Sequence, residues 1–281
     1  MTDVGIISIE LFLLLILLLA AWSFRIMRRR HLEQCELLKS EIDELELQKI
    51  NLTDVGLRLL ELKEALELEQ EKSARLLRNI LPERVIQDLR EKGSSKPERF
   101  DNVTVFFADI VNFTGIAPQL DPAELILELS DIFGEFDRIF ARHGCERIKT
   151  VGDAYMAAGG LLENQSDHCS CMLMAALEAR DYLQQRNHTP GRRCWPMRFG
   201  INCGCVIGGI VGREKYLYDI LGDTVNIASR IEHASEAMKI NVSDSVYQQM
   251  HDRFDFTPRG MVSVKGKGAM EMYFLEGVKT Q

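Results

Sequence analysis

Two aspartates stand where an isolated carboxylate would be costly to bury. Asp109 ends the largely apolar run VTVFFAD (103–109), and Asp153 follows Gly152 in a turn between two strand-like segments. Either aspartate alone is best interpreted as a cap or turn residue, because a lone buried carboxylate loses its hydration. If their strands are neighbours, the two carboxylates meet with no nucleophile or base between them. Such a pair predicts a site for a hard cation, Mg2+ or Mn2+.

The residues that follow Asp109 have a backbone suited to phosphate. Asn112-Phe113-Thr114-Gly115 is predicted to begin a helix, and the first N–H groups of a helix have no partner within it. Such N–H groups bind phosphate oxygens well. Phe113 and Thr114 are therefore candidate substrate-binding residues.

A second polar group lies further along the chain. Asn226 and Arg230 are four residues apart in TVNIASRIEHASEA (224–237), so they share one face of the predicted helix. The planar guanidinium of arginine can contact two oxygens at once and keeps its charge. The alternative role for Arg230 is a surface salt bridge with Glu232 or another neighbour.

Lys149 allows two interpretations. It lies four residues before Asp153 in ERIKTVGDAYMAAGG (146–160), a spacing that by itself indicates a salt bridge across a hairpin. The other interpretation places Lys149 in a binding site, and the remaining motifs decide between the two.

The elements that hold these residues alternate between strands and helices. The expected strands are 103–109, RIKT, AYMAAGG, INVS, a hairpin of MRFGINCG and CVIGGIVG (197–212), and two strands near the C-terminus; the expected helices are 121–144, about 167–186 and 224–237. Asp121 is the predicted N-cap of the first helix and Gly144 its stop. This order predicts an α+β fold, a ferredoxin-like βαββαβ core with extensions, with its helices on one face of the sheet.

The N-terminal segment has the length and composition of a membrane helix. Residues 6–24, IISIELFLLLILLLAAWSF, are almost entirely apolar and would span roughly 28 Å as a helix, close to the thickness of a bilayer core. The arginines of RIMRRRH, which follow, favour the cytoplasmic side. We therefore expect a single-pass membrane protein with the rest of the chain in the cytoplasm. A cleaved signal peptide is the alternative, but Asp3 replaces the positive start that it needs.

Residues 31–80 have the pattern of a coiled coil. Leucines recur every seven residues at 38, 45, 52, 59 and 66, with charged residues outside the seam. The alternative is a long amphipathic helix packed on its own domain. Pro82 is expected to end this helix, and residues 81–99 form a connector with a short helix closed by Gly93.

Composition excludes one class of partner. A net charge of −8 and a pI of about 5.4 argue against a broad nucleic-acid-binding surface. The seven cysteines have no disulfide-framework spacing. Cys169-Ser-Cys171, beside His168, and Cys203-Gly-Cys205 lack the two-residue spacer of a zinc knuckle, so reduced cysteines are the better interpretation than zinc ligands.

Three of these motifs together resemble a known family. FFADIVNFT, RIKTVGDAYM and YDILGDTVNIASR match the class III nucleotide cyclase catalytic domain in order, type and spacing, over residues 100–277. VKGKG (264–268) completes the set. The segment LLRNILPERV is similar to the connector that often enters these domains.

The resemblance implies a reaction and its metal ions. Two divalent cations, Mg2+ or Mn2+, are expected on Asp109 and Asp153, with Ile110 beside them. The 3′-hydroxyl of a nucleoside triphosphate would attack its own α-phosphate and release pyrophosphate, with one cation lowering the pKa of the hydroxyl and the other holding the leaving group.

The resemblance also assigns the polar residues of the second half. It gives Asn226 the ribose, Arg230 the charge that develops on phosphorus, and Lys265 the triphosphate. Lys267, two residues on, would face the same side of a strand and is the alternative to Lys265.

The same family places two residues against the purine, at the positions of Lys149 and Asp219. Lysine only donates hydrogen bonds and ionised aspartate only accepts them, which fits N1 and the 6-amino group of adenine. Guanine reverses both requirements, and guanylate-type members carry glutamate and cysteine there. The pair predicts ATP as substrate, although Lys149 and Asp219 could also pair with each other in the empty site.

We therefore expect a membrane-anchored adenylate cyclase that converts ATP to cyclic AMP, dimeric through its coiled coil. In this family each site lies between two domains, so a homodimer would contain two shared sites. A guanylate cyclase is the alternative within enzymes, and a catalytically silent cyclase-like module for dimerisation or regulation is the alternative outside them. A purely structural membrane-anchored coiled coil leaves the polar motifs unexplained, and the sequence does not indicate the upstream regulator.

Overall fold

The chain forms two compact units, Met1–Leu76 and Leu77–Gln281. The computed structural model describes residues 3–78, 80–161, 167–212, 216–264 and 266–279, with backbone alone for residues 3–13. The helices are α1 (Asp3–Arg78), α2 (Glu83–Lys92), α3 (Phe113–Ile116), α4 (Pro122–Arg142), α5 (His168–His188), α6 (Asp223–His233) and α7 (Asp244–Met250), with a 3-10 turn at Ala117–Gln119. The strands are β1 (Glu98–Ile110), β2 (Glu146–Val151), β3 (Ala154–Gly159), β4 (Met197–Val211), β5 (Leu217–Leu221), β6 (Ile240–Ser243), β7 (Phe254–Val264) and β8 (Gly268–Val278).

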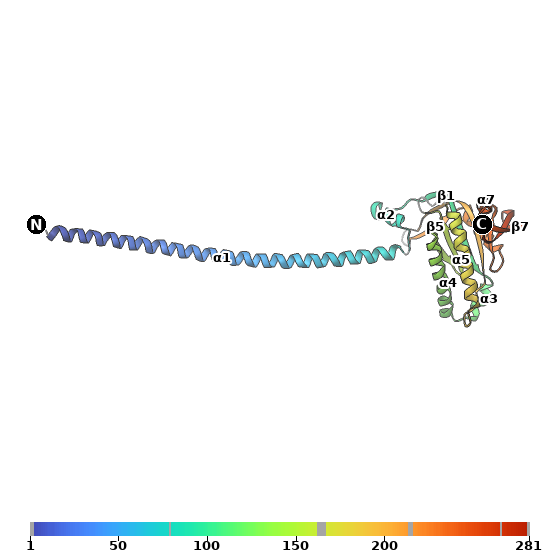
Figure 1. The fold of residues 1–281 in the computed structure, drawn as a ribbon, viewed down its shortest axis with the longest axis horizontal. Helices are drawn as coiled ribbons and strands as arrows, with labels where there is room; N and C mark the ends of the chain where they lie inside the picture. The colour runs from blue at the N-terminus through green and yellow to red at the C-terminus, as the bar shows by residue number, and fades with distance from the viewer. Residues whose placement is uncertain (1–2, 79, 162–166, 213–215, 265, 280–281) are drawn as a thin grey trace. The chain divides into compact units, whose positions relative to one another are not determined.

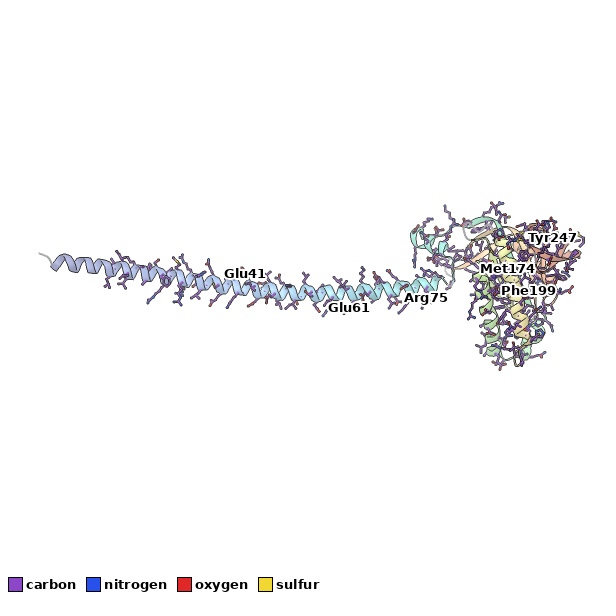
Figure 2. The ribbon with its side chains drawn as sticks, in the orientation of Figure 1. Glu41, Glu61, Arg75, Met174, Phe199 and Tyr247 are labelled. Atoms are coloured by element: carbon purple, nitrogen blue, oxygen red, sulfur yellow. The ribbon has the colours of Figure 1, made fainter. Side chains whose placement is uncertain are left out.

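Helix α1 runs without a break from Asp3 to Arg78, through the predicted segment 6–24 and nearly all of the predicted segment 31–80 (Figure 1). From residue 14 onwards nearly all its described side chains, among them Glu41 and Glu61, are exposed to solvent (Figure 2), and Ala74 is the buried exception among them. The five seam leucines are between 55% and 74% exposed in the single chain. Across the part of the chain that the structure describes, no helix is both long and apolar enough to cross a membrane. The coiled coil stays a prediction.

The second unit contains one mixed sheet with the strand order β2-β3-β1-β4-β6-β8-β7, and β5 pairs with β4 outside this path. Strand β1 is antiparallel to β3 and to β4, whereas β4 and β6 are parallel. The elements β1, α4, β2, β3, α5 and β4 form the predicted βαββαβ core, and the later strands extend the sheet. The predicted α+β fold class is confirmed.

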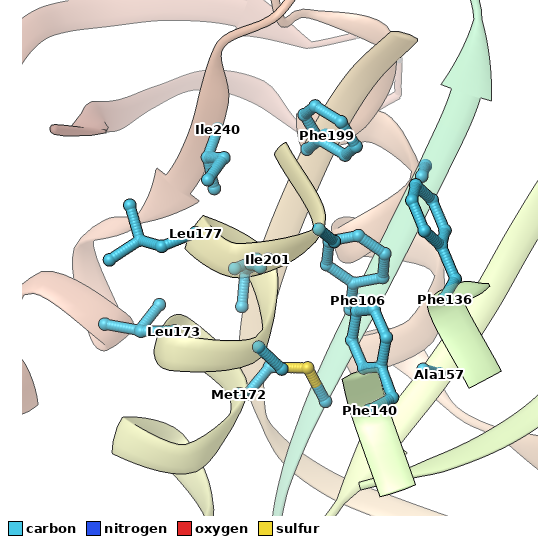
Figure 3. Packing of buried hydrophobic residues seen from close by; sticks show 14 of the residues in the cluster. Phe106, Phe136, Phe140, Ala157, Met172, Leu173, Leu177, Phe199, Ile201 and Ile240 are labelled. Atoms are coloured by element: carbon cyan, nitrogen blue, oxygen red, sulfur yellow. The ribbon is translucent and has the colours of Figure 1, made fainter. Parts of the chain in front are cut away.

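Helices cover both faces of this sheet, contrary to the expectation that they pack on one face. Phe106 and Ile110 of β1 point into a core with α4 and α5, which lie side by side in Figure 1 and pack as Figure 3 shows. Val103 and Val105, at the alternate positions of β1, point into a second core with α2 and α6. Side chains of a strand alternate between faces, so odd-numbered Asp109 belongs to the face of α6.

Several predicted boundaries are confirmed by local geometry. The backbone N–H groups of Ala123 and Glu124 donate to Asp121, which caps α4 as its sequence predicts. Gly93 has a φ of 69° and closes α2 in the left-handed conformation. The short helix α7 and strand β5 were not predicted, because neither is long enough to show a clear periodicity.

The predicted hairpin over 197–212 is wrong. Residues 197–211 form the single strand β4, which pairs with β1 along most of its length and with β5 near its end. The glycines that suggested a turn serve close packing instead. A Cβ on Gly200 would lie 2.2 Å from the backbone nitrogen of Glu232, and one on Gly204 would lie 2.7 Å from the Thr224 hydroxyl.

Buried hydrogen bonds fix α6 on β4 and β6. The Asn202 side chain donates to the Thr224 carbonyl at 3.0 Å, and the Thr224 hydroxyl donates to the Cys205 carbonyl at 2.6 Å. At the other end of α6, the Asn241 side chain donates to the Ile231 carbonyl at 2.8 Å. Because these groups are buried, leaving any of them unpaired would cost about 1–3 kcal/mol. Helix α6 therefore has one position on the sheet.

Gly200→Ala is expected to lower the free energy of unfolding by about 1–3 kcal/mol, because its methyl group would collide with the α6 backbone. The measurement is urea unfolding followed by circular dichroism. Gly134→Ala on α4 is the matched control, since a Cβ there meets no atom within 4 Å and should raise stability by up to about 1 kcal/mol. Equal stability of Gly200→Ala and the wild type would contradict the close packing of α6.

Candidate active site

Asp109 and Asp153 meet at one end of the sheet. Asp109 is the penultimate residue of β1, and Asp153 lies in the turn between β2 and β3, of which β3 pairs with β1. Their carboxyl groups lie close enough to interact, and the backbone N–H groups of Asp153 and Ile110 partly offset the repulsion. Burial, together with the Asp109 carboxyl, raises the pKa of Asp153 to about 6. The condition set by the sequence, neighbouring strands, is met.

This pair has the chemistry of a divalent-cation site. Two neighbouring carboxylates repel each other, which contributes to the raised pKa of Asp153, and a bound cation would relieve this repulsion. Mg2+ and Mn2+ prefer oxygen ligands of this kind. Among the described residues no group of three or more His, Cys, Asp or Glu forms a metal cluster, so phosphate oxygens or water would have to complete the coordination.

Arg198 and Glu232 extend the carboxylate pair. Arg198 lies opposite Asp109 on β4, and its Nη2 donates to Asp109 Oδ2 at 3.0 Å. Its Nε lies 3.2 Å from Oε1 of Glu232, which is only 2% exposed. Burial raises the pKa of the Glu232 carboxyl to about 7, against the opposite effects of His233 and Arg198. Glu232 therefore contacts Arg198, whereas the sequence had suggested it as a partner of Arg230.

The sequence motifs did not single out Arg198, and they indicated Arg230 rather than Arg198 as the partner of Glu232. Arg198 lies between Met197 and Phe199, whose side chains are fully buried. It is therefore a charged residue at the start of an otherwise apolar strand. A search for the cation that compensates Asp109 would have found it, because an isolated buried carboxylate needs a partner.

Phe113 and Thr114 form the first turn of α3, directly after Asp109 and Ile110. Asn112 precedes them in the left-handed conformation, with a φ of 59°. The N–H groups of Gly115 and Ile116 both donate to the Asn112 carbonyl. The N–H groups of Phe113 and Thr114 thus stand at the open start of this turn, beside the carboxylate pair.

Lys149 and Asp219 form an ion pair. Lys149 lies on β2 and Asp219 on β5, and the Lys149 Nζ is 2.5 Å from Asp219 Oδ2. Asp219 is 7% exposed, and its Oδ1 accepts a hydrogen bond from the Ile220 N–H at 2.9 Å. Lys149 lines a cleft of about 710 Å³, together with Tyr218, which precedes Asp219 in the sequence, and Pro82 of the connector. The structure therefore joins the two predicted purine residues, and each satisfies the other.

Asn226 and Arg230 lie on α6, one turn apart. Asn226 is exposed and Arg230 is half-buried. The Nη1 of Arg230 has no hydrogen-bond partner among the described residues, and a Cβ on Gly266 would lie 3.7 Å from its Nη2. The guanidinium thus lies beside the turn between β7 and β8, in the predicted VKGKG motif. A buried guanidinium nitrogen without a partner suits an anion that arrives with the substrate.

Two lysines of the VKGKG motif, Lys265 and Lys267, are candidates for binding the triphosphate. Lys265 lies outside the described residues. Lys267 Nζ lies 2.6 Å from Oδ1 of Asp223, the first residue of α6. This ion pair links the β7–β8 turn to the helix of Asn226 and Arg230.

The cysteines are free thiols, and no metal cluster includes them in the described part of the chain. Cys203 and Cys205 are alternate residues of β4, with Cys203 partly buried and Cys205 exposed. The zinc interpretation, disfavoured by spacing, gains no support from this arrangement.

The pKa of Asp153 predicts a pH-dependent stability in metal-free buffer. Between the ordinary value of 3.8 and about 6, the folded chain keeps a proton that the unfolded chain has lost, so stability falls as pH rises through this window. Asp153→Asn should therefore unfold at a higher temperature than the wild type at about pH 8, and the difference should close towards about pH 4. Thermal unfolding with a chelator measures it. The exposed Asp252→Asn is the control, and a wild type as stable as Asp153→Asn at the higher pH would refute the carboxylate pair.

Comparison with known sequences identifies the domain. The family described as "Adenylate and Guanylate cyclase catalytic domain" matches residues 95–277. An adenylate cyclase of Mycobacterium tuberculosis is 36% identical over 215 residues, which are 76% of this chain and 48% of that protein. Human guanylyl cyclase C is 36% identical over 219 residues, which are 76% of this chain and 20% of that protein. The chain thus spans less than half the length of these curated relatives.

Solved structures give the same result. The guanylate cyclase domain of RhGC from Catenaria anguillulae, in complex with GTP, is 35% identical with a TM-score of 0.62, and the match covers 65% of this chain and all of that one. The catalytic core of a rhodopsin-guanylyl cyclase with converted specificity, in complex with ATPαS, has the same identity and TM-score and covers 65% of this chain and 99% of the other. The chain therefore belongs to the class III nucleotide cyclases and carries their catalytic domain.

Proposed function

We propose that this protein is an adenylate cyclase, which converts ATP to 3′,5′-cyclic AMP and pyrophosphate. Class III cyclase domains as a family use divalent cations and bind a nucleoside triphosphate, and the relatives include both adenylate and guanylate cyclases. Membership of the family therefore leaves the base open. The choice of ATP has to come from this chain's own residues.

One observation carries that choice, the ion pair of Lys149 and Asp219. Lysine supplies only donors and ionised aspartate only acceptors, which matches the acceptor N1 and the donor 6-amino group of adenine. Asp219 is nearly buried and its second oxygen is held by the Ile220 N–H, so its acceptor has a fixed direction. Guanine would present a donor to Lys149 or an acceptor to Asp219 and leave buried groups unpaired.

The remaining residues bind and orient the substrate. Asp109 and Asp153 would hold the two divalent cations, Mg2+ or Mn2+, which would supply positive charge to lower the pKa of the 3′-hydroxyl and to stabilise the triphosphate. The N–H groups of Phe113 and Thr114, in the turn after Ile110, would donate to phosphate oxygens of the substrate.

Helix α6 supplies the other polar contacts. Asn226 orients the ribose from its exposed face, and Arg230 has the unpartnered guanidinium nitrogen needed for charge that develops at phosphorus. The triphosphate lysine is Lys265. Catalysis thus depends on position and charge more than on a protein base.

Two alternatives differ from this proposal in their sequence requirements. A guanylate cyclase would need a hydrogen-bond acceptor in place of Lys149. Overall similarity does not separate the two activities, because the adenylate cyclase and guanylyl cyclase relatives are both 36% identical to this chain. A catalytically silent module would be expected to lack one of the metal, ribose or arginine residues, whereas Asp109, Asp153, Asn226 and Arg230 are all present.

The proposed enzyme is a homodimer. The exposed seam leucines of α1 are the surface that a second helix would cover, and one chain carries one copy of each half of the site. Two-fold symmetry then gives two equivalent sites, each with the metal pair of one chain and the Asn226–Arg230 helix of the other. Membrane attachment through residues 6–24, with the cyclase domain in the cytoplasm, remains a prediction from the sequence.

The base choice is tested by Lys149→Glu combined with Asp219→Cys. We expect ATP turnover to fall strongly and the ratio of GTP to ATP turnover to rise, because each mismatched polar contact costs about 1–3 kcal/mol. Purified protein is assayed with Mn2+ and with ATP or GTP in parallel. The matched control is Lys239→Glu combined with Glu276→Cys, at an ion pair elsewhere on the domain. An unaltered preference for ATP over GTP would sink the purine assignment.

The shared site is tested by complementation. Asp109→Ala and Arg230→Ala should each be inactive, since each homodimer loses both sites. In a mixed dimer one site collects both defects and the other collects none, so random pairing should restore roughly a quarter of the wild-type activity. Activity is measured after subunit exchange, with mixed dimers demonstrated by crosslinking. Silence of demonstrated mixed dimers would mean that the residues of a site come from one chain.

A further inference from the structure

Arg198 lies between two carboxylates that belong to different elements. Its Nη2 is 3.0 Å from Asp109 at the end of β1, and its Nε is 3.2 Å from Glu232 on α6. The side chains of Arg198 and Asp109 are 24% and 19% exposed, so water screens these contacts only weakly. The proposed function uses Asp109 and leaves Glu232 without a role.

Glu232 is held in place by backbone packing. The absence of a side chain at Gly200 lets the Glu232 backbone rest directly on β4, which places the start of its side chain beside the strand of Arg198. Its other oxygen, Oε2, lies 2.9 Å from Nδ1 of the exposed His233. The Nε of Arg198 and the Oε1 of Glu232 have no well-aligned hydrogen bond among the described residues, so their contact is chiefly electrostatic.

Charge gives this arrangement a function. Without Glu232, the guanidinium would have Asp109 as its main anionic partner and would compete with any cation for that carboxylate. We propose that Glu232 is a positioning residue, which holds Arg198 by charge and thereby keeps Asp109 available to a divalent cation. When ionised, Asp109, Asp153 and Glu232 with Arg198 carry a net charge of −2, and loss of Glu232 would halve it.

The inference rests on the proposed metal site at Asp109 and Asp153. It adds a link within one chain, because Glu232 lies two residues after Arg230 on α6. In the proposed dimer, Asp109 and Arg230 of one chain serve different sites. The contact from Asp109 through Arg198 to Glu232 therefore connects the metal pair of one site to the helix that completes the other.

The test is Mn2+ binding by the full-length protein without nucleotide, followed by the electron paramagnetic resonance signal of free Mn2+. The variants are Glu232→Gln, Arg198→Gln and the double variant. Glu232→Gln should raise the Kd about tenfold, Arg198→Gln should lower it about threefold or more, and the double variant should return to within about threefold of the wild type. Opposite signs of the two single variants are not expected of groups that only stabilise the fold.

Conditions and controls isolate the charge effect. Binding is measured at about pH 8.5, above the pKa of Glu232. Glu236→Gln, an exposed residue that lies 3.7 Å from Arg259, is the matched control and should leave the Kd unchanged. Circular dichroism shows whether each variant is folded, and if Glu232→Gln does not fold, Arg198→Gln tests the same relation through the tighter binding it must produce.

The outcomes separate this inference from the function on which it rests. An unaltered Kd in folded Glu232→Gln and Arg198→Gln, or weaker binding in both, would overturn the role of Glu232. Asp109→Ala should abolish Mn2+ binding whatever Glu232 does. Retained binding in Asp109→Ala would overturn the proposed metal site itself, and with it the enzyme mechanism.

Discussion

The close approach of α6 to β4 is the constraint on which the site depends. It needs Gly200 and Gly204, because a methyl group at either position would collide with α6. Buried hydrogen bonds from Asn202 and Asn241 then fix the helix along its axis. As a result, one rigid helix carries Asn226, Arg230 and the Glu232 carboxylate, which lies 3.2 Å from Arg198 of β4. A site that works by position rather than by a protein base requires such rigidity.

The second constraint is an excess of negative charge at the end of β1. The carboxyl groups of Asp109 and Asp153 interact with each other. Arg198 forms ion pairs with Asp109 and with the buried Glu232. The raised pKa values of Asp153 and Glu232 show that burial makes this charge unfavourable in the absence of metal ions. The repulsion between these carboxylates lowers the stability of the metal-free fold, and a bound divalent cation would reduce it. Groups with such shifted pKa values are typical of functional sites.

The sequence predicted the elements whose signals are local. Asp121 and Gly93 mark helix ends through their own conformation, and the βαββαβ order follows from alternating periods. The strand β4 was mistaken for a hairpin because glycine permits both a turn and a close approach, and only the partner, α6, decides between them. Arg198 was missed, and Glu232 was paired with Arg230, for the same reason: their partners are distant from them in sequence. Lys149 and Asp219 could be paired in advance only through the family resemblance.

The connector is part of the core rather than a loose tether. Val85 and Ile86 of α2 pack with Val105 of β1 and Ala228 of α6, in the same buried cluster. Near its end, strand β1 carries Asp109 of the proposed metal pair, and α6 carries the residues proposed to bind the ribose and the phosphates. Because a close-packed interior transmits displacement instead of absorbing it, a shift of α2 has to be accommodated by β1 or by α6. The packing therefore links α2, the first helix after α1, to the two elements that carry the residues of the proposed site.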